Sequence, residues 1–265
     1  MKICVVHVNA EKYSGSYTPM ITANFERAKA EGTIICHRFV QHLKRATDTV
    51  FAYPSLLNKV DVAEEMLKAE AEGADAVMVA CSGDTGVAEA RTLVSIPVVG
   101  PMEAALHLAC AYGHKVGIVT TADRSWSEYC EMMVSAYGLS SRFAGVRRIA
   151  TPSSEAFTKG FTQPQEMARE IAAHAKALVE AGANSIVIGS AGMSVMATAA
   201  GLARVPEYGA PIFDCLTVGL KTAELRSDLQ RKLAVPETSR VGWGERLMPP
   251  DLGRLRKLFA LAPQA

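Results

Sequence analysis

Residues 73–86, GADAVMVACSGDTG, carry the clearest indication of the fold class. Within this stretch, Ala76–Ala80 is a short and wholly apolar run, which predicts a strand that is buried on both faces. Gly73 precedes this run at the end of an amphipathic segment, as is typical of a helix C-terminus. Cys81 and several small residues follow, and a helical pattern then begins. The stretch therefore predicts a strand, a tight turn and a helix, the repeating unit of a parallel α/β sheet.

A second copy of this unit occurs later in the chain. GANSIVIGSAG, residues 182–192, aligns with the first stretch at an offset of 109 residues. Two further pairs of apolar runs align in the same order: residues 2–8 with 115–121 at an offset of 113, and residues 96–99 with 210–213 at an offset of 114. Because the offset is nearly constant, we interpret the chain as a duplicated α/β half.

Apolar strands alternate with amphipathic helices along the chain, which predicts parallel sheets covered on both faces. We therefore expect an α/β fold with two pseudo-symmetric lobes, each a mostly parallel sheet flanked by helices. Ligands in such sheets bind beyond the carboxyl ends of the strands, so the active site is expected in the cleft between the lobes. Residues 1–100 would form the first lobe and residues 101–214 the second, with residues 215–265 packing back on the first.

The composition excludes several classes of protein. The chain has 265 residues, 49% of them hydrophobic, and a net charge of +1, so no charged field favours nucleic acid or an anionic membrane. No apolar run approaches the roughly 20 residues of a membrane helix, and the N-terminus is more typical of a buried strand than of a signal peptide. The six cysteines show no CxxC pair and no metal-ligand spacing, which predicts reduced thiols, a cytoplasmic location and no metal. Because the chain also lacks a phosphate-binding glycine motif, no cofactor is expected.

The turn after each duplicated strand carries the candidate chemistry. Cys81 in the first half stands where Ser190 stands in the second. Backbone N–H groups and the positive end of a helix dipole at such a turn bind anions and lower the pKa of a thiol. Cys81 is therefore a candidate thiolate base or nucleophile. The alternative is a buried cysteine with a purely structural role.

Neighbouring residues would bind the substrate. The backbone N–H groups of the small residues at the two turns would stabilise an enolate oxygen; these residues are Ser82, Gly83, Ala191 and Gly192. Two hydroxyls at the end of the strand 115–121, those of Thr120 and Thr121, would bind a carboxylate or a ring carbonyl, unless they are ordinary strand-end residues. Asp84 is expected to cap the helix that follows it.

The chain resembles the aspartate/glutamate/hydantoin racemase superfamily, and within it the hydantoin and allantoin racemase branch. The resemblance rests on residues 80–121, on GSAGM at 189–193 and on residues 210–214. It implies a cofactor-independent enzyme whose two lobes present two cysteines on opposite sides of the substrate. One thiolate would remove the α-proton while the other thiol protonates the opposite face. The resemblance also implies that Asn9, at the end of the first strand, holds a polar group of the substrate; the alternative is an ordinary turn residue.

The chain departs from this pattern at Ser190, where the family has its second cysteine. A serine hydroxyl is a far weaker acid than a thiol, whose pKa is about 8.5, and no His, Lys or Asp adjoins Ser190 in the sequence. Either a cysteine has been replaced at this position, or the enzyme uses one thiol.

These observations predict a racemase or isomerase that acts at the carbon next to a carbonyl of a small hydantoin-, amino-acid- or dicarboxylate-like substrate. Cys81 would be the acid/base, and Ser190 would take the partner position. The alternative is a single-cysteine decarboxylase, cis-trans isomerase or hydrolase of the same superfamily. A two-lobed binding protein is disfavoured by the thiol in the cleft. We expect the chain to form a homo-oligomer and to bind a small-molecule substrate.

Overall fold

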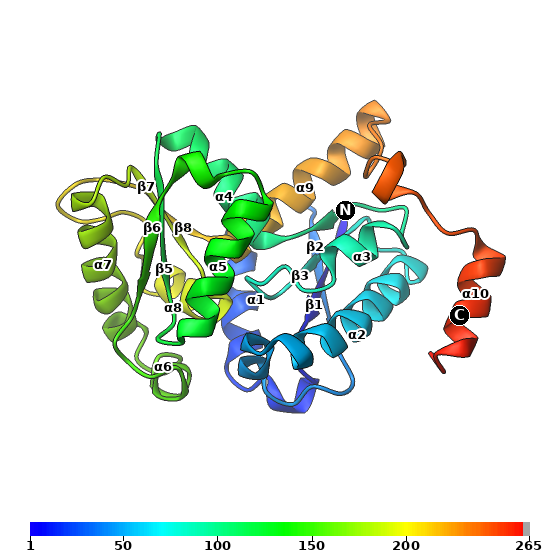
Figure 1. Ribbon diagram of the computed structural model, residues 1–265, viewed down its shortest axis with the longest axis horizontal. Coiled ribbons are helices and arrows are strands. Elements are labelled where there is room, and N and C mark those ends of the chain that lie inside the picture. Colours follow the sequence, from blue (N-terminus) through cyan, green and yellow to red (C-terminus); the bar gives the residue numbers. More distant parts are fainter. Residues whose placement is uncertain (262–265) are drawn as a thin grey trace.

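A computed structural model describes residues 1–261. Two four-stranded sheets lie side by side, and helices cover their faces (Figure 1). Every strand pair within them is parallel. The strands of the first sheet are β1 (Lys2–His7), β2 (Ile34–Phe39), β3 (Ala76–Val79) and β4 (Val98–Val99). Those of the second are β5 (Val116–Thr120), β6 (Phe143–Arg148), β7 (Ser185–Ile188) and β8 (Ile212–Asp214). The predicted α/β fold with two parallel sheets is confirmed.

The two sheets share one topology. Their strand orders are β2-β1-β3-β4 and β6-β5-β7-β8, so each sheet begins at its second strand in sequence and ends at its fourth. The central strands β1, β3, β5 and β7 are almost wholly buried, because helices cover both faces of each sheet. The internal repeat in the sequence therefore corresponds to two copies of one strand arrangement.

Ten α-helices connect and cover the strands in the described part of the chain. In the first half these are α1 (Tyr17–Ala28), α2 (Ala52–Ala71), α3 (Val87–Arg91) and α4 (Pro101–Tyr112). The later ones are α5 (Arg124–Ala136), α6 (Ser153–Lys159), α7 (Pro164–Glu180), α8 (Ala191–Ala199), α9 (Cys215–Leu233) and α10 (Pro249–Leu258). Within the described residues, no helix combines the length and the apolarity needed to cross a membrane.

Helix α9 returns from the second sheet to the first. It packs against α4, β3 and β4, and its Glu224 accepts hydrogen bonds from the Ala30 amide at 2.7 Å and from Thr33 Oγ1 at 2.8 Å. Arg240 then ties the chain beyond α9 to the carbonyl of Arg91 at 2.8 Å. The C-terminal segment, red in Figure 1, ends in α10 beside α2.

Helix α2 begins at Ala52, so it extends well before the amphipathic segment that ends at Gly73. The periodicity of polar and apolar residues predicts only the part that covers the sheet. The added residues, 52–60, place apolar side chains on the outer face of the helix, so their sequence does not show a solvated side.

Candidate active site

A cavity of about 520 Å³ lies between the lobes, at the carboxyl ends of four strands. Segments just beyond β1, β3, β5 and β7 each contribute to its wall, as the parallel topology requires. Of the predicted site residues, seven line it: Asn9, Cys81, Ser82, Thr121, Ser190, Ala191 and Gly192. The duplicated fold therefore brings together residues that are far apart in the sequence.

Cys81 contributes the thiol of this cavity. Its Sγ accepts hydrogen bonds from the Gly83 amide at 3.4 Å and from Thr85 Oγ1 at 3.5 Å. Burial raises the pKa of Cys81 above its ordinary value, while these two donors oppose the rise because they favour the thiolate. Of the six cysteines in the chain, Cys81 is the one among the cavity-lining residues. Its position supports one acid/base or nucleophilic group on the side of the first lobe.

Ser190 lies on the second-lobe side of the same cavity and begins helix α8. Its Oγ accepts a hydrogen bond from the Met193 amide at 3.4 Å, so the hydroxyl caps the helix. The first N–H groups of a helix have no partner within it, and those of Ala191 and Gly192 therefore provide donors for a negatively charged oxygen. The side chain of Ser190 can donate its own proton into the cavity while it remains a cap.

The carbonyl of Gly189, directly before Ser190, joins the two lobes. It accepts hydrogen bonds from Trp126 Nε1 at 2.7 Å, Thr120 Oγ1 at 2.9 Å and Ser82 Oγ at 3.2 Å. Ser82 belongs to the first lobe, so its bond crosses the interface between the sheets. These three donors hold the turn that presents Ser190.

Two of the predicted binding residues make hydrogen bonds within the protein instead of facing the cavity. Thr120 and Gly83 do not line the cavity. Side chains alternate along a strand, so Thr120 turns toward Gly189 while Thr121 faces the cavity. The Gly83 amide donates to Cys81 Sγ, and its carbonyl accepts from Tyr129 at 3.2 Å, which leaves both groups engaged within the protein.

Two predicted binding groups do face the cavity. Thr121 Oγ1 is buried and, within residues 1–261, has no hydrogen-bond partner, so it offers an unused donor and acceptor to a ligand. Asn9 is also buried, and its amide nitrogen makes one long bond to the Ala10 carbonyl at 3.4 Å. Both side chains have hydrogen-bonding capacity left for a small polar molecule.

Asp84 caps a different helix from the one expected. Its carboxylate accepts from the amides of Met102 at 2.9 Å and Glu103 at 2.8 Å, at the start of α4, and from Tyr137 Oη at 2.6 Å. Its φ of +46° lies in the left-handed region, which turns the carboxylate away from the adjacent α3. Burial nonetheless raises the pKa of Asp84 to about 6.

Several cavity-lining residues were not found by sequence reasoning. Two cations, Lys44 and Arg45, stand at the edge of the cavity, and Asp123 is the sole carboxylate among the lining residues. The aromatic residues are Tyr13, Tyr17, Trp126, Phe157 and Phe161. Tyr17 Oη donates to the Ala80 carbonyl at 3.1 Å, next to Cys81. The two cations, Asp123, Trp126 and the two phenylalanines belong to no sequence motif, so only the folded chain identifies them.

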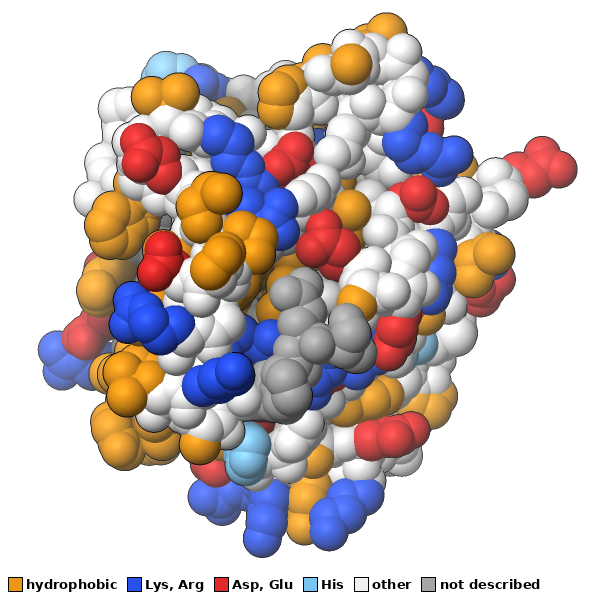
Figure 2. Space-filling view, turned by 90° about the vertical axis from the view of Figure 1, so that its right-hand side faces the viewer, with side chains coloured by type: hydrophobic (Ala, Val, Ile, Leu, Met, Phe, Trp, Pro, Cys, Tyr) orange, Lys and Arg blue, Asp and Glu red, His pale blue; other side chains and the backbone are white. Residues whose placement is uncertain are grey.

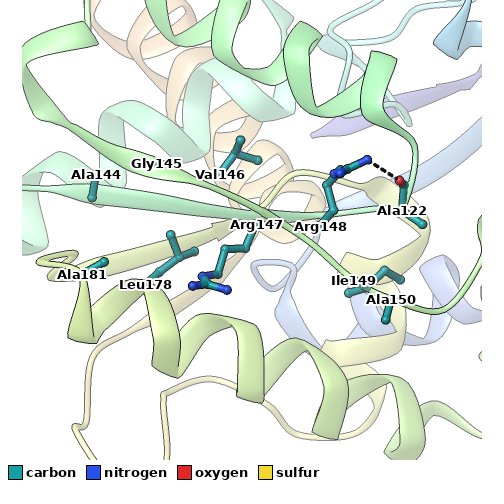
Figure 3. Close-up of a pocket in the computed structure, with 10 residues that line it drawn as sticks. All are labelled: Ala122, Ala144, Gly145, Val146, Arg147, Arg148, Ile149, Ala150, Leu178 and Ala181. Carbon is teal, nitrogen blue, oxygen red and sulfur yellow. Dashed lines mark hydrogen bonds between the residues drawn. The ribbon is translucent and has the colours of Figure 1, made fainter.

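Another hollow, of about 580 Å³, lies along the edge strand β6 (Figure 3). Backbone and aliphatic groups form most of its wall, and Arg148 reaches across to the carbonyl of Ala122 at 3.1 Å. Its ten lining residues include no thiol, carboxylate or imidazole. The cavity at Cys81 is therefore the candidate active site.

Comparison with known proteins places the chain among racemases. A family model described as Asp/Glu/Hydantoin racemase matches residues 10–223. A hydantoin racemase of Pseudomonas sp. (strain NS671) is 33% identical over 187 residues, which cover 70% of this chain and 72% of that protein. A hydantoin racemase of Paenarthrobacter aurescens is 29% identical over 227 residues, with 84% and 90% covered. The solved structure of an allantoin racemase from Klebsiella pneumoniae has a TM-score of 0.77 and 26% identity, covering 94% of each chain.

Proposed function

Because the chain belongs to the Asp/Glu/hydantoin racemase family and is an isomerase, we propose that it inverts the carbon next to a carbonyl in a small hydantoin-like ring without a cofactor. The observation that carries the proposal is the placement of Cys81 at the cavity between the lobes, with two hydrogen-bond donors on its sulfur. The names of the relatives support the choice of a hydantoin-like ring over an amino acid or a dicarboxylate.

Cys81 removes the proton in this mechanism. Its thiolate takes the α-proton, so that a C–H bond breaks, an S–H bond forms and negative charge develops on the carbonyl oxygen. The N–H groups at the start of α8 stabilise this charge, because unpaired amides at a helix N-terminus favour an anion. Thr121 and Asn9 hold the polar edge of the ring.

Ser190 returns a proton to the opposite face. The hydroxyl proton passes to the carbanion, water then reprotonates the serine oxygen, and the Cys81 thiol gives its proton to the hydroxide that remains, which restores the thiolate. Because a hydroxyl is a much weaker acid than a thiol, this step is slow, and the substrate returns more often to its original configuration by taking a proton from Cys81. Exchange of the α-proton with solvent should therefore be faster than inversion.

Proton NMR in D₂O tests this mechanism with single enantiomers of 5-substituted hydantoins and of allantoin. The wild type should exchange the α-proton with little inversion, Ser190→Cys should racemise, and Cys81→Ala should do neither. Cys110→Ala is a matched control, because this cysteine does not line the cavity. Absence of exchange with every substrate in the wild type and in Ser190→Cys would refute the proposed reaction.

A decarboxylase is the second candidate, favoured by the single thiol among the cavity-lining residues. Decarboxylation leaves an enolate that needs a proton on one face only, so it does not need a competent group at Ser190. Malonate-like substrates separate the two reactions, since loss of CO₂ changes the product mass and isomerisation does not. The same panel, extended to maleate and ring amides, would reveal a cis-trans isomerase or a hydrolase.

A further inference from the structure

The first half of helix α2 exposes an apolar stripe. Tyr53, Leu56, Leu57 and Val60 follow the spacing i, i+3, i+4, i+7, which places them on one face of a helix. Each is between 46% and 70% exposed, as is Phe51 just before the helix. Apolar residues at this spacing normally form the buried face of a helix, yet no other segment within residues 1–261 covers these side chains. These five residues are called the α2 stripe below.

We propose that the α2 stripe is the interface between two copies of this chain. Two helices that carry the same stripe pack against each other across a two-fold axis, because an isologous interface uses one patch twice. Leu56 and Leu57 lie at the middle of the stripe and would stand closest to the axis. Val60 of one copy would then face the Phe51 end of the other copy.

The area of the stripe suits such a dimer. The exposed parts of its five side chains amount to on the order of 500 Å², against roughly 800 Å² per partner in a standard interface with its polar rim. A patch of this size is at the upper end of what a soluble monomer exposes. The apolar stripe would thus form the core of the interface, and neighbouring polar residues its rim.

The charges around the stripe favour a second copy over a charged partner. Lys59 pairs with Glu89 at 3.3 Å, Asp61 accepts from His42 Nδ1 at 2.8 Å, and Glu64 pairs with an arginine of α10 at 2.5 Å. Each charged side chain of α2 next to the stripe is therefore engaged within its own chain. An acidic or basic peptide would find no countercharge here, whereas an identical apolar face needs none.

The C-terminal segment extends the apolar surface beyond the stripe. Arg256, through its bond to Glu64, fixes α10 one helical turn beyond Val60. One turn after Arg256, the side chain of Phe259 is exposed. Figure 2 shows the side of the molecule on which this segment lies, with hydrophobic side chains among charged ones.

The stripe also adjoins the candidate active site. Phe51 directly follows Val50, which lines the cavity, and the short helix Ala46–Val50 forms part of the same wall. Contact between two α2 helices would therefore hold this wall of the cavity in place. The interface does not depend on which reaction the cavity catalyses.

Sedimentation velocity of the full chain, from micromolar to about 100 µM on the scale of ordinary protein–protein affinities, tests the proposal. The wild type should sediment as a dimer, Leu57→Glu as a monomer, and the control Leu225→Glu as a dimer, since Leu225 is equally exposed at 59% but lies on α9. Circular dichroism checks that each variant is folded. A monomeric wild type, or a dimeric and folded Leu57→Glu, would overturn the interface.

A second variant covers the case in which Leu57→Glu does not fold. Leu57→Cys should form a disulfide with the second copy under mild oxidation, because the two side chains meet near the two-fold axis. Peptide mass spectrometry identifies the linked residues, which separates this bond from one made by a native cysteine. Absence of a link between the two copies at this position would contradict the proposed arrangement.

Discussion

Replacing Thr85 by valine should raise the pKa of the Cys81 thiol further and lower its thiolate fraction about tenfold. Thr85 is buried, and its Oγ1 donates to Cys81 Sγ at 3.5 Å. Valine has nearly the same shape but no hydroxyl, so the thiolate would lose this donor while it keeps the Gly83 amide at 3.4 Å. Burial already raises the pKa of Cys81, and the loss of one donor adds to that effect.

The magnitude follows from the difference between the two protonation states. A hydrogen bond to a charged acceptor contributes about 1.5 kcal/mol, and about 1.4 kcal/mol corresponds to one pH unit in pKa. The neutral thiol gains less from the same donor, so most of this energy favours the thiolate. Below the pKa, the thiolate fraction, and with it the rate of alkylation, should fall about tenfold.

Alkylation by iodoacetamide across a range of pH, followed at Cys81 by peptide mass spectrometry, measures this change. Thr85→Ser keeps the hydroxyl and should behave as the wild type does. Thermal unfolding checks that Thr85→Val remains folded at each pH. An unchanged or lower pKa in a folded Thr85→Val would show that Thr85 does not stabilise the thiolate.

Three other changes test the surroundings of the site. Burial raises the pKa of Asp84 from 3.8 to about 6, so the folded chain keeps a proton that the unfolded chain has lost. The free energy of unfolding should therefore fall as the pH rises, by about 3 kcal/mol between roughly pH 4 and pH 7 relative to the Asp84→Asn variant. Urea titrations at several pH values measure this change. A difference between the two proteins that does not vary with pH would contradict the prediction. In Gly192→Ala the new Cβ would overlap Phe157 Cε1. The ring must move, which should lower the free energy of unfolding by about 1–3 kcal/mol in chemical unfolding, and unchanged stability would argue against this contact. A hydrogen bond with Cys4 lowers the pKa of Cys36 to about 7, so Cys36 should be alkylated faster than Cys81 at neutral pH. The Cys4→Ala variant should slow the alkylation of Cys36. An unchanged rate would show that Cys4 does not lower the pKa of Cys36.

Local sequence patterns are enough to predict the strands, the duplication and the pair of equivalent turns. Strand patterns such as Ala76–Val79 and Ser185–Ile188 are local, because a strand buried on both faces must be apolar at every position. The nearly constant offset between the two halves makes Ser190 the counterpart of Cys81. Both residues line one cavity in the structure.

Which neighbours of those two residues face the cavity depends on packing between distant segments of the chain. Strand alternation and local hydrogen bonds turn Thr120 away, and a left-handed backbone at Asp84 sends its carboxylate to a helix that begins 17 residues later. Asp123, Trp126 and the two phenylalanines that line the cavity belong to no sequence motif, because contacts between distant segments bring them to the cavity. The α2 stripe is likewise visible only as exposed surface. Its sequence has the pattern of a buried face, and burial depends on what packs against a helix.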